Sequence, residues 1–145
     1  MRYGWRHRFV RHAAVALLLC SSVAIGDSGV ATEGVAVRAL PHEAREVLRR
    51  AQHGGPYRYD RDGAAFGNYE RLLPARRRGF YREYTVDTPG VGHRGARRLV
   101  IGCHRKRATD APVREPAFAG FRDCAGPAEV YYTDDHYRSF RRVFP

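Results

Sequence analysis

The sequence predicts an α+β domain in which one N-terminal helix packs on a single antiparallel β-sheet of about five strands. Its 145 residues are enough for one domain with a modest core. Helical periodicity occurs in one early segment, 41–52, and the apolar runs after it are short, aromatic or β-branched, and bounded by Gly, Pro or Asp. One helix followed by short strands favours an antiparallel sheet with the helix on one face and the other face open.

The first 24 residues have the composition of a secretory signal peptide. Arginines precede an apolar run at 13–20, and Ser22-Val23-Ala24 offers the small residues that a signal peptidase reads. We therefore expect cleavage near Ala24 and a secreted, extracellular mature chain. A membrane anchor is the alternative, but the apolar run is shorter than the ~20 residues that cross a bilayer, so we expect no membrane segment in the mature form.

Residues 25–38 are predicted to be a flexible lead-in, because they are rich in Gly, Ser and Thr and show little periodicity. The helix is predicted over 41–52, where Pro41 suits the first turn and Gly54-Gly55-Pro56 ends it. Its apolar positions recur at helical spacing, namely Leu40, Ala44, Val47, Leu48 and Ala51. Nothing on this helix suggests chemistry, so we interpret it as a packing element that opens a domain at 39–145.

Positive charge dominates the chain. Lys and Arg number 26 against 15 Asp and Glu, a formal net charge of +11. The predicted signal contains four of the arginines and no acidic residue, so the mature chain keeps a clear positive excess. Such an excess favours polyanionic partners, nucleic acid before anionic membranes or polysaccharides. Most of the cations are arginines, which bind phosphate through two parallel hydrogen bonds.

A strand pair is predicted between residues 80 and 101, after a loop at 56–63, a short strand at 64–70 and a charged turn at 76–79. The run 80–86 is aromatic and β-branched, Pro89-Gly90 interrupts it, and 99–101 resumes a strand. Alternation places Glu83 on one face beside a strand that carries Arg94 and Arg98, and Gly95 permits the bend that lets both arginines converge. An acid among guanidinium groups suits a phosphodiester site, although a surface ion pair is the commoner meaning of such charges.

The C-terminal part combines a surface insert with the last two strands. Residues 104–123 lack periodicity and are predicted to form the insert, and strands are predicted at 130–133 and 137–144. Cys103 and Cys124 flank the insert, and one cysteine pair in an exported chain predicts a disulfide. A zinc site that also uses His104 is the weaker alternative, because a Cys-x-x-Cys pair is missing.

Several motifs follow one another in an order and spacing typical of a known family. They are Leu40-Pro41-His42-Glu43-Ala44, Gly54-Gly55-Pro56-Tyr57, Asp62-Gly63-x-x-Phe66-x-Asn68-x-Glu70-x-x-Leu73-Pro74, Tyr81-x-Glu83-Tyr84-Thr85-Val86-x-Thr88-Pro89-Gly90, Arg94-Gly95-x-Arg97-Arg98 and Tyr131-Tyr132-Thr133-x-Asp135-His136-Tyr137-x-Ser139-Phe140. Together they resemble the secreted guanyl-specific microbial ribonucleases, the barnase-like family and especially its streptomycete branch. The match covers about residues 37–143.

The resemblance implies the microbial ribonuclease fold and an activity that needs no metal and no cofactor. Such enzymes cleave single-stranded RNA on the 3′ side of guanosine, first forming a 2′,3′-cyclic phosphate and then hydrolysing it. Glu83 matches the general base that takes the proton of the ribose 2′-hydroxyl, and His136 matches the general acid that protonates the leaving 5′-oxygen. Arg94 and Arg98 match the phosphate clamp. Tyr137 would contact the phosphate.

The resemblance also assigns guanine recognition to the loop that begins at Phe66. Glu70 matches the carboxylate that accepts hydrogen bonds from N1 and N2 of the base. Backbone groups around Asn68 and Tyr69 would address the O6 edge, and Tyr69 could stack on the base. Gly67 and Tyr69 depart from the family pattern, which has a polar residue and an arginine there, so a relaxed guanine preference is one expectation.

Two other functions fit parts of the sequence. One is a non-enzymatic secreted protein that binds polyanions, which a degenerate pair of Glu83 and His136 would favour. The other is a ribonuclease toxin domain with the same chemistry that is delivered into cells. For the secreted enzyme, the expected partners are single-stranded RNA and a barstar-like protein inhibitor, and the expected oligomeric state is a monomer.

Overall fold

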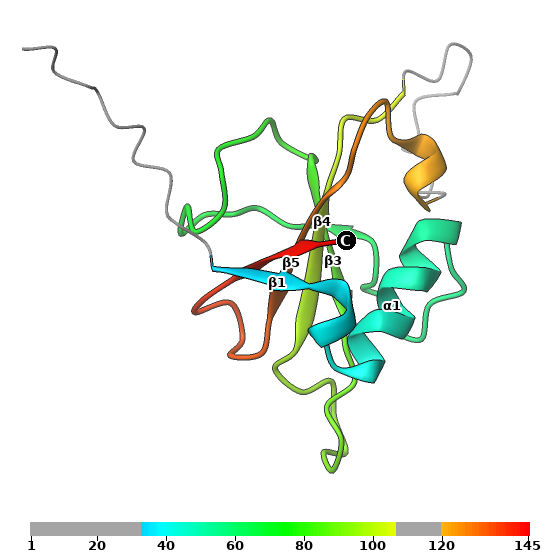
Figure 1. The fold of residues 1–145 in the computed structure, drawn as a ribbon, viewed down its shortest axis with the longest axis vertical. Coiled ribbons are helices and arrows are strands. Elements are labelled where there is room, and N and C mark those ends of the chain that lie inside the picture. The colour runs from blue at the N-terminus through cyan, green and yellow to red at the C-terminus, as the bar shows by residue number, and fades with distance from the viewer. Residues whose placement is uncertain (1–32, 107–119) are drawn as a thin grey trace, which may run out of the picture.

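The computed structural model describes residues 33–106 and 120–145 (Figure 1). The elements, in chain order, are β1 (Gly34–Ala36), the 3₁₀-helix η1 (Val37–Ala39), α1 (His42–His53), β2 (Ala64–Ala65), β3 (Tyr81–Thr85), β4 (Arg98–Gly102), the 3₁₀-helix η2 (Gly120–Asp123), β5 (Glu129–Thr133) and β6 (Arg141–Phe144). The predicted signal peptide and the middle of the predicted insert lie outside the described residues. Of the helices described, none has both the length and the apolar character that a bilayer crossing requires.

The six strands form one sheet in the order β1-β6-β5-β4-β3-β2. The predicted α+β class, with one α-helix on one sheet, is confirmed; the sheet has six strands where about five were predicted, and the purely antiparallel arrangement is wrong. The extra strand is β1, which pairs in parallel with β6 and aligns Val35 with Val143. It lies inside the predicted flexible lead-in, so that prediction is wrong for its last residues. Three residues are too few to show a periodic pattern, and the pairing with β6 supplies the order that the local sequence lacks.

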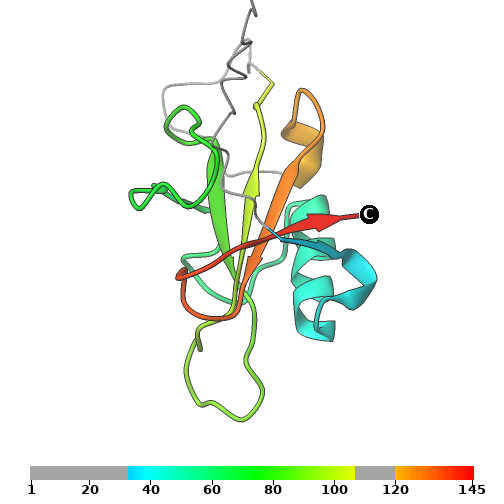
Figure 2. The same cartoon turned by 60° about the vertical axis from the view of Figure 1, so that its left-hand side comes forward.

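The helix α1 covers one face of the sheet, as both cartoon views show (Figures 1 and 2). It begins after Pro41 and ends at Gly54, whose left-handed conformation (φ 84°) stops the helix close to the predicted position. The helix buries Ala44, Leu48 and Ala51. They pack against side chains that point from the strands toward the helix, among them Tyr84, Val86, Leu99, Ile101, Tyr132 and Val143.

The other face of the sheet is half covered rather than open. A second apolar cluster lies there, built from strand residues such as Tyr81 and Tyr131 and from loop residues that include Leu73 and Phe140. In Figures 1 and 2 the green loop between β2 and β3 lies on the side of the sheet away from α1. The predicted strand at 64–70 shortens to Ala64–Ala65, because Asn68 turns the chain with φ 48°. The uncovered half of this face holds the polar residues described below.

The ends of the predicted insert are ordered and joined by the predicted disulfide. Cys103 and Cys124 are bonded, with their Cα atoms 5.6 Å apart, which leaves no free thiolate for the zinc alternative. In the described ranges no three His, Cys, Asp or Glu side chains gather as metal ligands. The short helix η2, inside the predicted insert, packs against the end of α1, where a Cβ on Gly120 would lie 2.5 Å from the Gly54 nitrogen. The expectation of an irregular surface loop is therefore wrong for the ends of the segment.

Candidate active site

Glu83 lies in the middle of β3, on the sheet face away from α1. The residue is 9% exposed, and it pairs with Val100 on β4 and Ala64 on β2. The Tyr137 hydroxyl donates a hydrogen bond of 2.7 Å to Glu83 Oε2, and Arg61 Nε lies 3.8 Å from Oε1. Burial, followed by this hydrogen bond, raises the pKa of Tyr137 to about 12, so the hydroxyl stays protonated and oriented toward the carboxylate.

Arg98 is buried at the start of β4 and is held by backbone carbonyls. Its Nη1 donates to the carbonyl oxygens of Gly95 at 2.9 Å and Arg97 at 2.7 Å. Its guanidinium carbon lies 5.8 Å from the centroid of the Tyr137 ring. Arg98 is therefore next to the tyrosine whose hydroxyl binds Glu83. Its Nε is buried without a hydrogen-bond partner. A buried donor of this kind is costly unless an acceptor reaches it, and a substrate phosphate oxygen is such an acceptor.

Arg94 was predicted to lie on the same strand as Arg98. It lies before β4, which begins at Arg98. The bend predicted at Gly95 is present, with φ 60°, and a Cβ there would lie 2.3 Å from Thr88 Oγ1. This bend brings Arg94 over the end of β3, where its Nε and Nη2 donate to Thr85 Oγ1 at 3.1 and 2.5 Å. Within the described part of the chain, neither Arg94 nor Arg98 pairs with a carboxylate, so both charges are available to an anion.

His136 is exposed in the turn between β5 and β6. Both His136 and Tyr137 have left-handed backbones, with φ 61° and 70°, which non-glycine residues rarely adopt without help from their surroundings. The two rings lie 5.2 Å apart. Because Tyr137 also binds Glu83, this turn joins the histidine to the carboxylate across the sheet. The turn also shortens the predicted strand at 137–144, which begins only at Arg141.

Asp135 holds this turn together. Its carboxylate accepts hydrogen bonds from Thr133 Oγ1 (2.8 Å), the Arg138 nitrogen (3.0 Å), and the nitrogen (3.0 Å) and Oγ (2.6 Å) of Ser139. Partial burial alone would raise the pKa of Asp135, but hydrogen bonds from Ser139, Thr133 and Arg138 outweigh it and lower the pKa to about 2. The ionised carboxylate therefore stabilises the backbone that presents His136.

The predicted guanine loop is held by its own contacts. The Phe66 ring stacks on Tyr137 at 5.4 Å, which links the loop to the turn of His136. The Asn68 side chain donates to the Leu73 carbonyl at 2.8 Å and accepts from the Leu73 nitrogen at 3.0 Å. This side chain is therefore occupied within the loop, and only the backbone of Asn68 can meet a base. Glu70 is exposed beside it.

The two departures from the family pattern in this loop fit each other. Tyr69 is 87% exposed, yet its ring folds back on Gly67, where a Cβ would lie 2.3 Å from the ring. A larger residue at 67 would force the Tyr69 ring to move. The ring therefore occupies the surface that Gly67 leaves open.

Three residues of the loop at 56–63 contact the site although sequence reasoning assigned them no role. Arg61 approaches Glu83, and the Tyr59 ring centroid lies 5.6 Å from the Arg94 guanidinium. Asp62 Oδ1 accepts from the Thr85 nitrogen at 2.7 Å and so fixes the end of β3. Tyrosines and charged residues in an irregular loop do not indicate a functional site by their pattern. Only the path of the chain around β2 brings these residues to the site.

Comparison with known proteins gives consistent results. A family model described as ribonuclease matches residues 26–143. Guanyl-specific ribonuclease Sa3 of Kitasatospora aureofaciens is 42% identical over 109 residues, which span 75% of this chain and 62% of that protein, less than two thirds of its length. Guanyl-specific ribonuclease St of Saccharopolyspora erythraea is 38% identical over 109 residues, 75% of this chain and 85% of that protein.

Solved structures of ribonuclease Sa2 resemble the fold. A structure of its complexes with mononucleotides superposes with a TM-score of 0.60 at 34% identity, covering 79% of this chain and 96% of that one. A structure with guanosine-2′-cyclophosphate gives a TM-score of 0.60 at 35% identity, covering 79% and 98%. The matched family model, the sequence relatives and the shared fold agree, and this chain therefore belongs to the ribonuclease family, with the guanyl-specific microbial ribonucleases as its relatives.

Proposed function

We propose that this chain is a secreted endoribonuclease that cleaves single-stranded RNA on the 3′ side of guanosine by general acid–base catalysis. The observation that carries the proposal is one constellation on the free half of the sheet face. A carboxylate, Glu83, is oriented by Tyr137, the same tyrosine ring borders Arg98, and the adjacent residue is His136. The guanyl-specific names of the relatives and the guanosine ligand in the Sa2 structure support the substrate.

In the proposed reaction, the ribose 2′-oxygen attacks phosphorus while Glu83 accepts its proton. The bond from phosphorus to the 5′-oxygen breaks, and protonated His136 donates its proton to that oxygen, which leaves a 2′,3′-cyclic phosphate. Water then opens the cyclic phosphate with the two roles reversed. Arg94 and Arg98 stabilise the charge that grows on the phosphoryl oxygens. The 2′-hydroxyl is itself the nucleophile, so DNA is not a substrate.

Guanine would be selected by the loop 66–70. The exposed Glu70 carboxylate would accept from N1 and N2, and backbone groups at Asn68 and Tyr69 would meet O6. Adenine carries an acceptor at N1 where guanine carries a donor, so it would leave Glu70 without its partner. With Asn68 engaged by Leu73, the backbone contacts keep a defined position. We expect guanine preference to survive the changes at Gly67 and Tyr69, in relaxed form.

The test is cleavage of the dinucleotides GpC, ApC and UpC by the purified mature protein in excess chelator. We expect GpC to be cleaved fastest, with a 2′,3′-cyclic phosphate as the first product. Equal rates on all three would contradict the guanine assignment while leaving the acid–base mechanism in place. RNA binding without cleavage of any substrate would contradict the enzymatic proposal and favour a polyanion-binding protein.

The proposal extends to the location and state of the mature protein. We expect export with cleavage near Ala24, because basic, apolar and small residues follow one another in that order at the start of the chain. We also expect a monomer in solution. N-terminal sequencing of the secreted protein and sedimentation analysis measure the two. A barstar-like inhibitor would act by covering Arg94, Arg98 and His136, so its binding should compete with a guanosine mononucleotide.

A further inference from the structure

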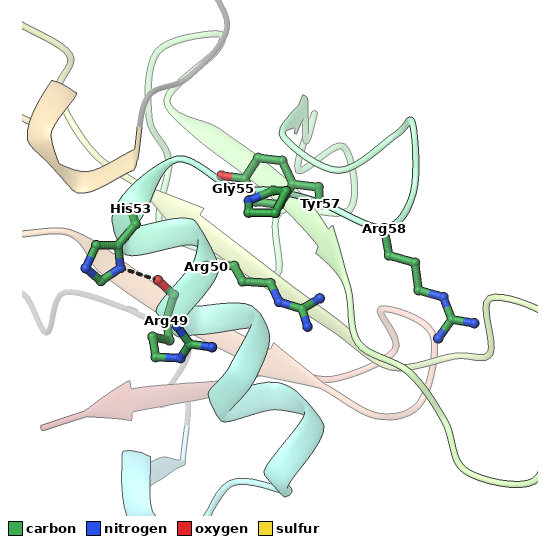
Figure 3. Close-up of a pocket in the computed structure, with 7 residues that line it drawn as sticks. Arg49, Arg50, His53, Gly55, Tyr57 and Arg58 are labelled. Atoms are coloured by element: carbon green, nitrogen blue, oxygen red, sulfur yellow. Dashed lines mark hydrogen bonds between the residues drawn. The ribbon is translucent and has the colours of Figure 1, made fainter.

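A hollow lies outside the proposed active site, between the end of α1 and the loop that follows it. Its lining is Arg49, Arg50, His53, Gly55, Pro56, Tyr57 and Arg58. None of these residues belongs to the proposed catalytic or guanine-binding sets. Figure 3 shows the Arg50 side chain reaching from the helix toward the loop that carries Arg58. Three guanidinium groups and one imidazole therefore line one depression, and its lining includes no carboxylate.

The cations of this hollow differ in how they are engaged. Arg49 pairs with Glu46 at 2.7 Å and Arg58 pairs with Asp87 at 2.9 Å, so each keeps part of its guanidinium for another acceptor. Within the described residues Arg50 has neither an ion pair nor a side-chain hydrogen bond, although it is only partly exposed. Arg50 also acts electrostatically on the Glu46 carboxylate one turn earlier, but its donors are not occupied by any described residue and remain available to an anion.

The end of the helix does not cancel this charge. A helix C-terminus carries free carbonyls and a partial negative charge that would repel an anion. Here His53 Nδ1 donates to the Arg49 carbonyl at 2.8 Å, and the Gly55 nitrogen donates to the Arg50 carbonyl at 2.9 Å. Arg122 Nη2 approaches the His53 carbonyl at 3.4 Å. Because these carbonyls are already bonded, they oppose an anion in the hollow less than free carbonyls would.

The loop that follows α1 carries arginines from the hollow toward the proposed active site. The Arg58 guanidinium lies 5.6 Å from the Tyr59 ring centroid, and Arg94 lies 5.6 Å from the same centroid. Arg61, on the same loop, approaches Glu83. The loop also carries Asp60 and Asp62, and Asp87 pairs with Arg58, so a polyanion that follows it from Glu83 meets arginines that alternate with carboxylates. It then reaches the hollow that Arg58 and Arg50 line together.

We propose that this hollow is an auxiliary phosphate subsite for the RNA chain, centred on Arg50, that binds a phosphodiester beyond the cleaved linkage. The inference rests on the proposed ribonuclease function. It predicts that substrates longer than a dinucleotide gain from Arg50, whereas a dinucleotide, which has one phosphodiester, does not.

The experiment compares Arg50→Gln with Arg45→Gln, a matched control on the same helix. Arg45 is exposed, lies outside the hollow and has no side-chain partner among the described residues, so both changes remove one cation from α1. The substrates are GpC and oligonucleotides with a single guanosine, extended by adenosines on the 5′ or the 3′ side. We expect unchanged GpC cleavage for both variants. With one of the two extended series, Arg50→Gln should lower kcat/KM about fivefold, which corresponds to the largest usual contribution of an exposed ion pair. Arg45→Gln should leave kcat/KM for the same substrates unchanged.

Binding provides a readout that does not depend on cleavage. A fluorescent oligonucleotide of the same sequence with 2′-O-methyl riboses has no nucleophile, so its Kd can be followed by anisotropy over a range of salt concentrations. Arg50→Gln should raise the Kd about fivefold and reduce the salt slope by about 0.7, the value for one phosphate of a single strand. Equal Kd values and equal extended-substrate rates for Arg50→Gln and Arg45→Gln would overturn the subsite. Failure of the wild type to cleave GpC would instead overturn the proposed function.

Discussion

At the residue scale, Glu83 is a buried carboxylate that accepts a hydrogen bond from Tyr137 and lies near Arg61, on the strand face that it shares with Tyr81 and Thr85. Glu83→Gln keeps the size and a hydrogen-bond acceptor but removes the proton acceptor. We expect it to lower the rate of GpC cleavage by ~10²–10⁴-fold, the usual contribution of a general base. Single-turnover cleavage measures the change, and Glu43→Gln, on α1 outside the site, is the control. Activity close to that of wild type in Glu83→Gln would show that another group takes the proton.

His136 has the complementary role, because the general acid must be protonated in the first step whereas the general base, Glu83, must be ionised. The rate should therefore show a bell-shaped dependence on pH, and His136→Ala should lose ~10²–10⁴-fold in rate together with the alkaline limb of the bell. His42→Ala, an exposed histidine at the start of α1, is the control. A monotonic profile for the wild type would sink the assignment of both residues.

Glu70 decides which base is accepted rather than how fast the phosphate reacts. Glu70→Ala should reduce cleavage after guanosine much more than cleavage after adenosine, because only guanine donates from N1 and N2. The ratio of kcat/KM for GpC and ApC measures this effect. An unchanged ratio, with both rates reduced equally, would mean that Glu70 supports the loop and does not read the base.

At the scale of elements, the turn between β5 and β6 depends on Asp135. Asp135→Ala removes four hydrogen bonds, so we expect a stability loss of ~1–2 kcal/mol, similar to the loss of a helix cap. Because the turn presents His136, kcat on GpC should fall by up to ~10²-fold, the effect of misplacing a catalytic group by about 1 Å, with KM little changed. Asp134→Ala, which removes a neighbouring carboxylate that bonds Arg141, is the control and should keep kcat.

The same carboxylate predicts a dependence of stability on acid. The folded pKa of Asp135, about 2, lies below its ordinary value of 3.8. Its contribution is therefore fully present above the ordinary value and is lost as the pH falls through the folded value. The difference in melting temperature between wild type and Asp135→Asn should shrink between pH 5 and pH 2. A difference that stays constant over this range would show that the charge of Asp135 does not contribute.

The disulfide and η2 form a second element whose role is stability. Cys103 and Cys124 are 21 residues apart, and closing a loop of that length stabilises a fold by about 3 kcal/mol in the chain-entropy model. The double variant Cys103→Ala/Cys124→Ala should lose stability of this order and still cleave GpC, because the bond lies in the apolar cluster on the helix side. Denaturant unfolding with and without reductant measures it. A midpoint equal to that of wild type would contradict the estimate.

At the scale of the whole molecule, the two sheet faces divide the work. The face under α1 holds the larger core, and the opposite face supports the site with a smaller aromatic cluster. The rings of Phe66, Tyr137 and Phe140 pack together in this smaller cluster, and Tyr137 also donates a hydrogen bond to Glu83. The guanine loop and the histidine turn are therefore held by the same rings, so a change in one of these loops should be transmitted to the other.

The positive excess that the mature chain keeps should act on substrates according to their length. Each phosphate neutralised on a single strand contributes about −0.7 to the slope of log affinity against log salt. We expect kcat/KM for long RNA to fall steeply as salt rises from about 50 to 200 mM, and kcat/KM for GpC to fall little. Steady-state rates over that range measure both slopes, and equal slopes would show that the excess charge does not act on the substrate.

The sequence by itself determined the parts of this protein that depend on neighbours along the chain. Local rules predicted the helical periodicity of α1 and the glycine that ends it, the central strand pair, the pairing of the two cysteines and the bend at Gly95. The spacing of the motifs indicated the family. Tertiary structure decided what depends on contacts between distant segments. No periodic pattern in the sequence predicts the pairing of β1 with β6 or the side chains that cover the second face of the sheet. The same holds for the hydrogen bond from Tyr137 to Glu83 and for the approach of Arg61 and Tyr59 to the site. Their free energy comes from partners far away in sequence, which a local pattern does not encode.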